Sequence, residues 1–186
     1  METLEIILIA VGLAMDAFAV SLSAATSGRL NSPRGTFRLS FHFGLFQFLM
    51  PVIGWFLGSW IEPLISSVSH WLAFLLLCYV GGKMIYESKS NHDAQIKSDP
   101  SKGFNLIFLS VATSIDALAI GLSLAMLEIE IWYPSFIIGI ITGLLSLIAI
   151  RLGKFTGTKL GKNMEVAGGL ILLGIGLKIL IEAMYF

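Results

Sequence analysis

Charged residues are scarce in this sequence: they make up 13% of its 186 residues, whereas apolar residues make up 56%. The mean hydropathy of +0.86 lies far above that of an average soluble domain, which excludes an ordinary water-soluble fold. Cys78 is the only cysteine, so an intrachain disulfide and a thiolate metal cluster are excluded as well. We therefore expect lipid to be the solvent of most of this chain.

The motifs of common ATPases and hydrolases are also missing. The sequence contains no GxxxxGK[ST], no GxSxG and no HExxH pattern. We therefore predict no enzymatic activity, no catalytic residue and no cofactor. The net charge of zero gives no sign of a nucleic acid partner.

What the sequence does contain is a series of long apolar stretches. A bilayer core about 30 Å thick needs roughly 20 apolar residues per helix, at about 1.5 Å of rise per residue. Stretches of this kind cover residues 4–26, 37–58, 70–86, 104–127, 132–152 and 166–186. The predicted fold is an all-α membrane protein with six transmembrane helices embedded in a lipid bilayer.

Positive charges are absent from the second and fourth connections between these stretches. All but Lys178 of the 12 lysine and arginine residues lie in or beside the first, third and fifth connections, namely Arg29, Arg34, Arg38, Lys83, Lys89, Lys97, Lys102, Arg151, Lys154, Lys159 and Lys162. The positive-inside rule then places these three connections in the cytoplasm and both termini outside it.

The two halves of the sequence resemble each other. Residues 10–25 (AVGLAMDAFAVSLSAA) align without a gap to residues 110–125 (SVATSIDALAIGLSLA). Gly44, Gly54 and Gly58 match Gly143, Gly153 and Gly157 at one constant spacing. We predict a first three-helix repeat at 1–90, a cytoplasmic linker at 91–102 and a second three-helix repeat at 103–186. Because each repeat holds an odd number of spans, the repeats are inverted in the membrane, a plan that many secondary transporters use.

Each repeat carries one aspartate near the middle of its first span, Asp16 or Asp116. An ionised carboxylate at that depth costs at least a few kcal/mol, so such residues normally face the protein interior. The stripe Gly12, Asp16, Ala19 and Ser23 recurs as Ala112, Asp116, Ala119 and Ser123, and small residues allow helices to approach closely. If the two stripes converge, the carboxylates form a site for a hard divalent cation such as Mg, Ca or Mn. The alternative is that the aspartates are protonated and hold the repeats together by hydrogen bonds.

Other polar residues inside the spans are candidates for an ion pathway or gate. They are Glu165, Ser23, Ser123, Thr113, Ser114 and Gln47. Hydrogen bonding between helices is the competing explanation for the uncharged ones. For Glu165, the alternative is an acid stabilised by a helix N-terminus.

These residues also carry a resemblance to a known family. AMDAFAVS at 14–21, ATSIDALAIG at 112–121, HWLAFLLLCYVGGKMIYE at 70–87 and EVAGGLILLGIGLKIL at 165–180 resemble the MntP family of manganese efflux pumps, within the wider LysE-like transporter superfamily. The resemblance implies a bacterial inner-membrane protein that exports Mn(II) as its substrate, with Asp16 and Asp116 serving transport and Glu165 matching a further family acid. Alternating access with proton counter-transport is the mechanism we expect.

Two other functions remain open from the residues alone. Two aspartates would also suit export of cadmium or of a cationic amino acid. An intramembrane aspartyl hydrolase is a more distant alternative, because paired aspartates can activate water. The sequence sets neither the oligomeric state nor the coupling ion.

Overall fold

The computed structural model describes residues 2–26, 30, 32–65 and 100–153, together with scattered residues between 71 and 86 and between 166 and 181. Its helices are α1 (Thr3–Thr26), α2 (Pro33–Ile65), α4 (Gly103–Ala112), α5 (Ile115–Met126) and α6 (Trp132–Gly153), and the described part contains no strand. Within it, four segments are long and apolar enough to cross a membrane, at Thr3–Thr26, Pro33–Trp60, Gly103–Met126 and Trp132–Gly153. The all-helical membrane fold is thus confirmed for these four spans. Only scattered residues of the third and sixth predicted spans are described, and those residues are helical.

Two helix boundaries differ from the prediction for clear local reasons. α2 begins at Pro33 instead of residue 37, because the Ser32 hydroxyl oxygen accepts from the Gly35 backbone N–H at 2.9 Å and proline is favoured in a first helical turn. The span predicted at 104–127 is divided into α4 and α5 by a turn at Thr113 and Ser114. At about 1.5 Å per residue, the 33 residues of α2 extend about 50 Å, well beyond a bilayer core.

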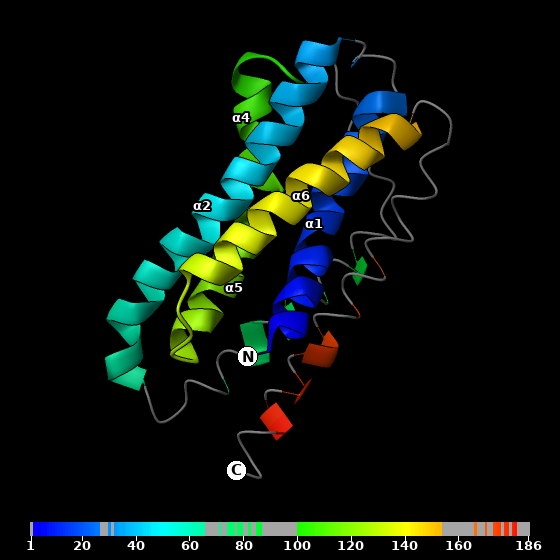
Figure 1. The fold of residues 1–186 in the computed structure, drawn as a ribbon. Coiled ribbons are helices and arrows are strands. Elements are labelled where there is room, and N and C mark those ends of the chain that lie inside the picture. Colours follow the sequence, from blue (N-terminus) through cyan, green and yellow to red (C-terminus); the bar gives the residue numbers. More distant parts are fainter. Residues whose placement is uncertain are drawn as a thin grey trace.

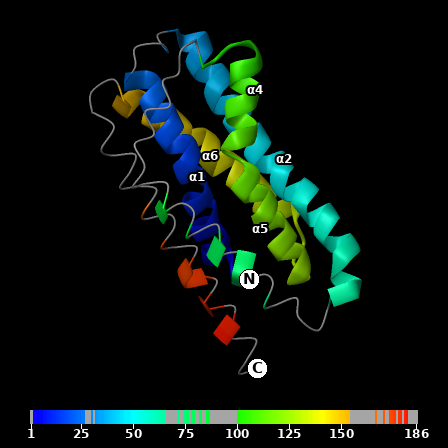
Figure 2. The same ribbon diagram turned by 180° about the vertical axis from the view of Figure 1, so that it is seen from behind.

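Helices that follow each other in the sequence are not the main packing partners. α1 packs along α6, and α2 packs against both α5 and α6, whereas α1 and α2 make little contact. Figures 1 and 2 show α4 and α5 following one another along α2. The α1–α6 pair runs parallel, because Phe18 packs with Ala149 and a Cβ on Gly153 would lie 2.8 Å from the Ala25 Cβ.

α2 and α5 also run parallel, and glycines at their interface allow the two helices to pack closely. A Cβ on Gly54 would lie 2.0 Å from the Leu118 carbonyl oxygen, and one on Gly58 would lie 2.8 Å from the Ala125 Cβ. A Cβ on Gly121 would likewise lie 2.0 Å from the Pro51 carbonyl oxygen. Only glycine allows the two backbones to approach this closely.

α2 and α6 cross in opposite directions. A Cβ on Gly44 would lie 2.8 Å from the Gly139 carbonyl oxygen, and one on Gly143 would lie 3.6 Å from the Ser40 carbonyl oxygen. Higher residue numbers on α2 thus face lower numbers on α6, which makes the pair antiparallel.

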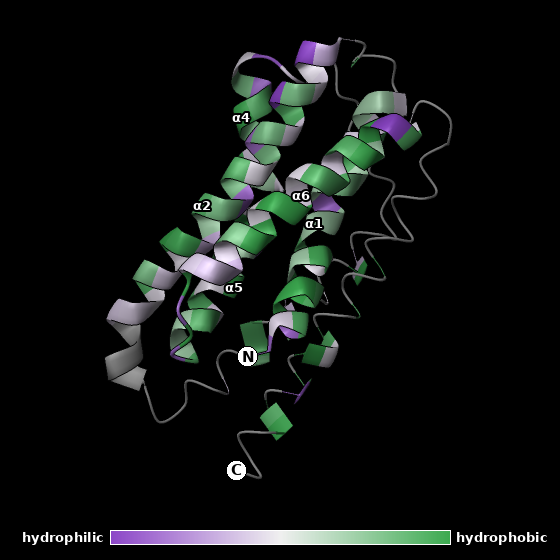
Figure 3. Ribbon diagram, in the orientation of Figure 1, coloured by the Kyte–Doolittle hydropathy of each residue, from purple (hydrophilic) through white to green (hydrophobic). Residues whose placement is uncertain are grey.

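Charged side chains gather at the ends of the bundle. The end of α1, the starts of α2 and α4 and the end of α6 lie together at the upper end in Figure 1, where Figure 3 shows hydrophilic residues. Of the described cations, Arg34, Arg38, Lys102 and Arg151 belong to these segments. Lys178 instead forms an ion pair with Glu5 near the start of α1. Four of the five described positive charges therefore belong to one end of the bundle, and Lys178 belongs to the other.

The apolar core joins the two halves of the chain. One cluster of buried residues includes Leu13 of α1, Ala117 of α5 and Ile138 of α6. Trp55 packs against the same cluster and donates from its Nε1 to the Ile129 carbonyl oxygen at 2.8 Å, which ties α2 to the connection between α5 and α6.

Candidate functional site

The interruption between α4 and α5 is built by three hydroxyl side chains. Ser110 donates to the Leu106 carbonyl at 2.7 Å, Thr113 donates to the Ser110 carbonyl at 3.3 Å, and Ser114 also donates to the Ser110 carbonyl. Such local bonds compete with the helical N–H donors for the same carbonyls. The backbone responds with a turn at Thr113 and Ser114, and a new helix starts at Ile115.

The equivalent stretch of α1 stays continuous. Its aligned residues are Ala10, Leu13 and Ala14, which carry no hydroxyl. Without side-chain donors to the backbone, the helical hydrogen bonds of α1 meet no such competition. The two aligned segments therefore share a sequence pattern, but α1 is continuous whereas the segment of α4 and α5 is interrupted.

Gln47 of α2 lies between these two segments. Its Nε2 donates to the carbonyl oxygen of Thr113 at 2.8 Å and lies 3.5 Å from that of Leu13. Leu13 and Thr113 are aligned positions of the two halves, and each precedes its aspartate by one helical turn. One fully buried side chain thus brings the middle of both aspartate-bearing segments together.

The two aspartates occupy equivalent places in their spans. Asp16 follows Thr3 by the same number of residues as Asp116 follows Gly103, and both spans are 24 residues long. Asp116 is only 4% exposed and stands in the first turn of α5, where the helix dipole favours an acid, whereas Asp16 is half-buried in the middle of α1. In the described part of the chain, no group of three His, Cys, Asp or Glu side chains lies close enough together to share a metal ion.

The other predicted site residues differ in their burial and in their hydrogen bonds. Thr113 and Ser114 form the interruption itself, and Ser123 is buried with its hydroxyl donating to the Ala119 carbonyl at 3.0 Å. Ser23 is half-buried, and its carbonyl accepts from the Thr26 hydroxyl at 3.0 Å. Glu165 lies outside the described residues.

Several buried oxygen atoms have no hydrogen-bond partner. They are the Oε1 of Gln47 and the hydroxyl oxygens of Ser21, Ser40, Ser135, Thr142 and Ser146. Ser135, Thr142 and Ser146 lie on the buried face of α6. Of these residues only Gln47 was among the predicted site residues, although hydroxyls at helical spacing on an otherwise apolar helix are visible in the sequence.

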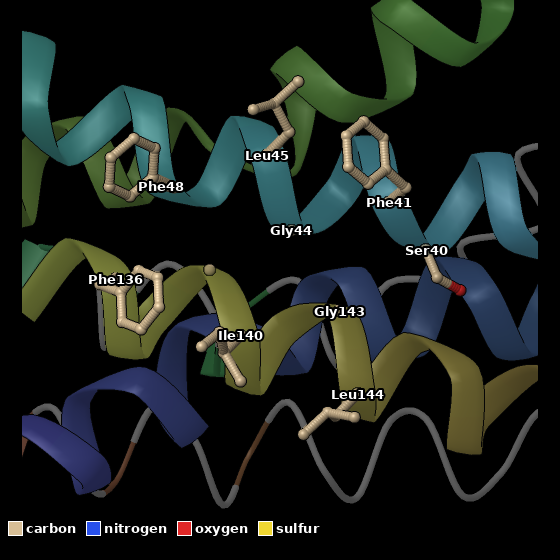
Figure 4. Close-up of a pocket in the computed structure, with 10 residues that line it drawn as sticks. Ser40, Phe41, Gly44, Leu45, Phe48, Phe136, Ile140, Gly143 and Leu144 are labelled. Carbon is tan, nitrogen blue, oxygen red and sulfur yellow. The ribbon is translucent and has the colours of Figure 1, made fainter.

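A separate groove lies between α2 and α6 (Figure 4). It has a volume of about 500 Å³, with Gly44, Gly139 and Gly143 at the helix crossing. Its remaining walls are Ser40, Phe41, Leu45, Phe48, Phe136, Ile140 and Leu144. None of the predicted site residues lines this groove, so it is not part of the candidate ion site.

Apolar helical spans around a buried glutamine and two mid-span aspartates define a multi-pass membrane protein with a polar centre between its helices. The chain belongs to the MntP family, because the family model described as "Putative manganese efflux pump" matches residues 30–180. This confirms the family indicated by the sequence motifs.

Relatives match nearly the whole chain. A protein of Syntrophotalea carbinolica is 50% identical over 183 residues, which cover 98% of this chain and 97% of the relative. One of Citrifermentans bemidjiense is 52% identical over 186 residues, with 98% and 97% covered, and one of Nitratidesulfovibrio vulgaris strain Hildenborough is 49% identical over 185 residues, with 98% and 92% covered. All three are named "Putative manganese efflux pump MntP". No solved structure matches the chain. The family is one of efflux pumps and not of enzymes, in agreement with the predicted lack of catalytic activity.

Proposed function

We propose that this chain is a secondary transporter of the bacterial inner membrane that exports Mn(II) from the cytoplasm by alternating access. We infer manganese as the substrate from the name of the family and the names of the relatives. We infer the position of the site from the residues of this chain. The cation binds between Asp16 and Asp116 near the middle of the membrane. Ser23, Ser123, Thr113, Ser114, Gln47 and Glu165 contribute to the pathway or its gates.

The contact of Gln47 with Thr113 and Leu13 is the observation that carries this proposal. Because the same nitrogen lies within 2.8 and 3.5 Å of the two carbonyl oxygens, the segments one turn before Asp16 and Asp116 are neighbours. Two carboxylates at this level provide the charge that a divalent cation needs. Hydroxyl and backbone oxygens nearby are of the kind that hard cations prefer as further ligands.

Helix packing supports an inverted repeat around this site. A two-fold axis between Gly44 and Gly143 would exchange α1 with α5 and α2 with α6. Under this exchange, the parallel α1–α6 pair corresponds to the parallel α2–α5 pair. The approach of Gly44 to the Gly139 carbonyl corresponds to that of Gly143 to the Ser40 carbonyl. The remaining two spans of the six-helix plan would complete one repeat each.

The paired carboxylates also suggest the coupling. Two carboxylates in a low-dielectric interior repel each other, and either a divalent cation or protons relieve that repulsion. Binding of Mn(II) then displaces protons, and release of Mn(II) outside lets protons return. Proton counter-transport is therefore the coupling we expect.

The experiment that tests this function is Mn(II) accumulation in inverted membrane vesicles. We would compare the parent with Asp16→Asn and Asp116→Asn at matched protein abundance, using Glu130→Gln in the exposed connection before α6 as the control. We expect both aspartate variants to lose at least about 10-fold in initial rate, since ligand-shell changes commonly cost 10- to 100-fold in metal affinity. If the parent moves no Mn(II), the substrate is wrong. If both aspartate variants match the parent, the aspartates are structural.

A further inference from the structure

The side-chain amide of Gln47 has a defined orientation. Carbonyl oxygens can only accept hydrogen bonds, so the NH2 end of the amide has to face the carbonyls of Thr113 and Leu13. The Oε1 atom consequently points away from both of them. Gln47 is 0% exposed, so water outside the protein does not reach this oxygen.

This Oε1 atom has no hydrogen-bond partner. A buried acceptor left without a partner costs about 1–3 kcal/mol, and such groups in native proteins often mark a functional site or an unoccupied ion position. The Nε2 atom of the same amide already contacts the carbonyl oxygens of Thr113 and Leu13. The unpartnered oxygen is therefore held in place and is not free to rotate toward a substitute donor.

The backbone of Gln47 has a second oxygen with an unusual position. In an α-helix the carbonyl of residue 47 accepts from the N–H of residue 51, but residue 51 is a proline inside α2 and has no N–H. The same residue thus carries a side-chain oxygen without a partner and a carbonyl without its usual helical donor. Carbonyls without a helical donor, such as those of unwound helix segments, coordinate ions in other transporters.

We propose that Gln47 is a ligand of the transported divalent cation, which it contacts through Oε1 while its Nε2 holds the interrupted segment at Thr113. This inference rests on the proposed function and adds a third side chain to the two aspartates. An amide oxygen is a suitable ligand for a hard cation, and it is neutral. The two carboxylates already balance the charge of a divalent ion, so a neutral third ligand raises affinity without trapping the cation by excess charge.

The competing role for Gln47 is that of a clamp alone, in which only Nε2 matters. Two substitutions separate these roles. Gln47→Glu keeps the side-chain length and, in the ionised form that a bound cation favours, offers oxygens but no hydrogen to donate to the Thr113 carbonyl. Gln47→Leu has a similar volume and removes both the donor and the acceptor. A ligand role predicts that Gln47→Glu binds metal and Gln47→Leu does not, whereas a clamp role predicts that both are impaired.

The test is a titration of the purified full-length protein with Mn(II), in which electron paramagnetic resonance measures the free ion. We expect Gln47→Leu to raise the Kd at least about 10-fold, because even residues behind the ligands change metal affinity by 10- to 100-fold. We expect the Kd of Gln47→Glu to stay within about 3-fold of the parent or to fall. Ser40→Ala is the matched control, since it removes another unpartnered buried oxygen from α2, two helical turns earlier, and should keep the parent Kd.

Each outcome decides the question. A parent Kd for Gln47→Leu overturns the ligand role, and so does a Kd for Gln47→Glu raised as far as that of Gln47→Leu. If Gln47→Leu does not fold, Gln47→Glu still decides, since retained binding supports the ligand role and lost binding overturns it. Asp16→Asn and Asp116→Asn in the same titration separate the two proposals. If both aspartate variants lose Mn(II) binding while both Gln47 variants bind like the parent, this inference alone is rejected. If the parent itself binds no Mn(II), the proposed function is rejected.

Discussion

Gln47 donates from its side-chain amide to the carbonyl oxygen of Thr113, the residue at which the helical hydrogen bonding of the fourth span is interrupted. The donor lies on α2 in the first half of the chain and the acceptor lies in the second half. Asp116 follows the acceptor by three residues, in the first turn of the new helix. This single bond therefore links the packing of the two halves to the position of a buried acid.

Removing the hydroxyls at the interruption should restore a continuous helix. We predict that the triple variant Ser110→Ala, Thr113→Leu, Ser114→Ala, which copies the residues of α1, joins α4 and α5 into one helix. The backbone amide of residue 114, which donates to the Val111 carbonyl oxygen at 3.1 Å instead of the carbonyl of residue 110, should then exchange more slowly with deuterium, because it gains its helical acceptor. Mn(II) transport should fall at least about 10-fold if the interruption shapes the site.

Ser135→Ala is the control for this variant, because it removes a buried hydroxyl from the uninterrupted helix α6. It should keep both the exchange pattern and the transport rate of the parent. An interruption that persists in the triple variant would show that tertiary contacts, such as that of Gln47, impose it.

The glycines between α2 and α5 should tolerate no side chain. In Gly121→Ala the new methyl group would lie 2.0 Å from the Pro51 carbonyl oxygen, and in Gly54→Ala it would lie 2.0 Å from that of Leu118. Both contacts are with backbone atoms, which cannot rotate away as a flexible side chain can. We therefore expect each variant to lose about 1–3 kcal/mol or more of stability. Thermal unfolding in detergent measures the loss.

Gly82→Ala and Gly174→Ala are the matched controls for the glycine prediction. Each position is helical, and no atom lies within 4 Å of a Cβ added there. Replacing such a glycine should stabilise the protein by about 0.4–1 kcal/mol, because the unfolded chain loses conformational freedom. A loss of stability in these controls comparable to that of Gly121→Ala would refute the backbone-contact explanation.

The four described spans and the matching positions of the two aspartates within them could be predicted because both depend on local sequence. Apolar stretches of the required length fix the spans, and Asp16 and Asp116 lie at matching positions of an aligned motif. The interruption was missed because hydropathy does not register it: Ser110, Thr113 and Ser114 are tolerated within an apolar span. The aligned stretch of α1 has no hydroxyl side chain at these three positions. This difference between the halves could have suggested that the hydroxyls bond to the backbone of the fourth span.

The contacts between the halves could not be predicted from local patterns. Gln47 was recognised only as a polar residue within a span, since nothing in its neighbourhood identifies Thr113 as its partner. The same is true of Lys178 and Glu5, which lie at opposite ends of the chain. These pairings depend on how the helices pack. The packing depends in turn on the shape of the helix surfaces, which glycines flatten where two helices cross.

The ion pair between Glu5 and Lys178 should contribute little to stability. The Lys178 side chain is 48% exposed and that of Glu5 is 14% exposed, so water screens much of their attraction. A double-mutant cycle with Glu5→Gln and Lys178→Gln, followed by thermal unfolding, should give a coupling of about 0.2–1 kcal/mol that shrinks at high salt. A coupling that salt does not change would mean that the pair is shielded from water.

The orientation in the membrane that we predict from the distribution of positive charge can be tested by labelling. Arg34, Arg38, Lys102 and Arg151 gather at one end of the bundle, which the positive-inside rule places in the cytoplasm. In a Cys78→Ser background, Ser32→Cys should react with a membrane-impermeant thiol reagent only in inverted vesicles, and Glu130→Cys should react only in intact spheroplasts. Both positions are exposed, so a missing reaction on the expected side cannot be attributed to burial. The opposite labelling pattern would place the termini in the cytoplasm, and the direction of transport through the proposed site would then have to be reassigned.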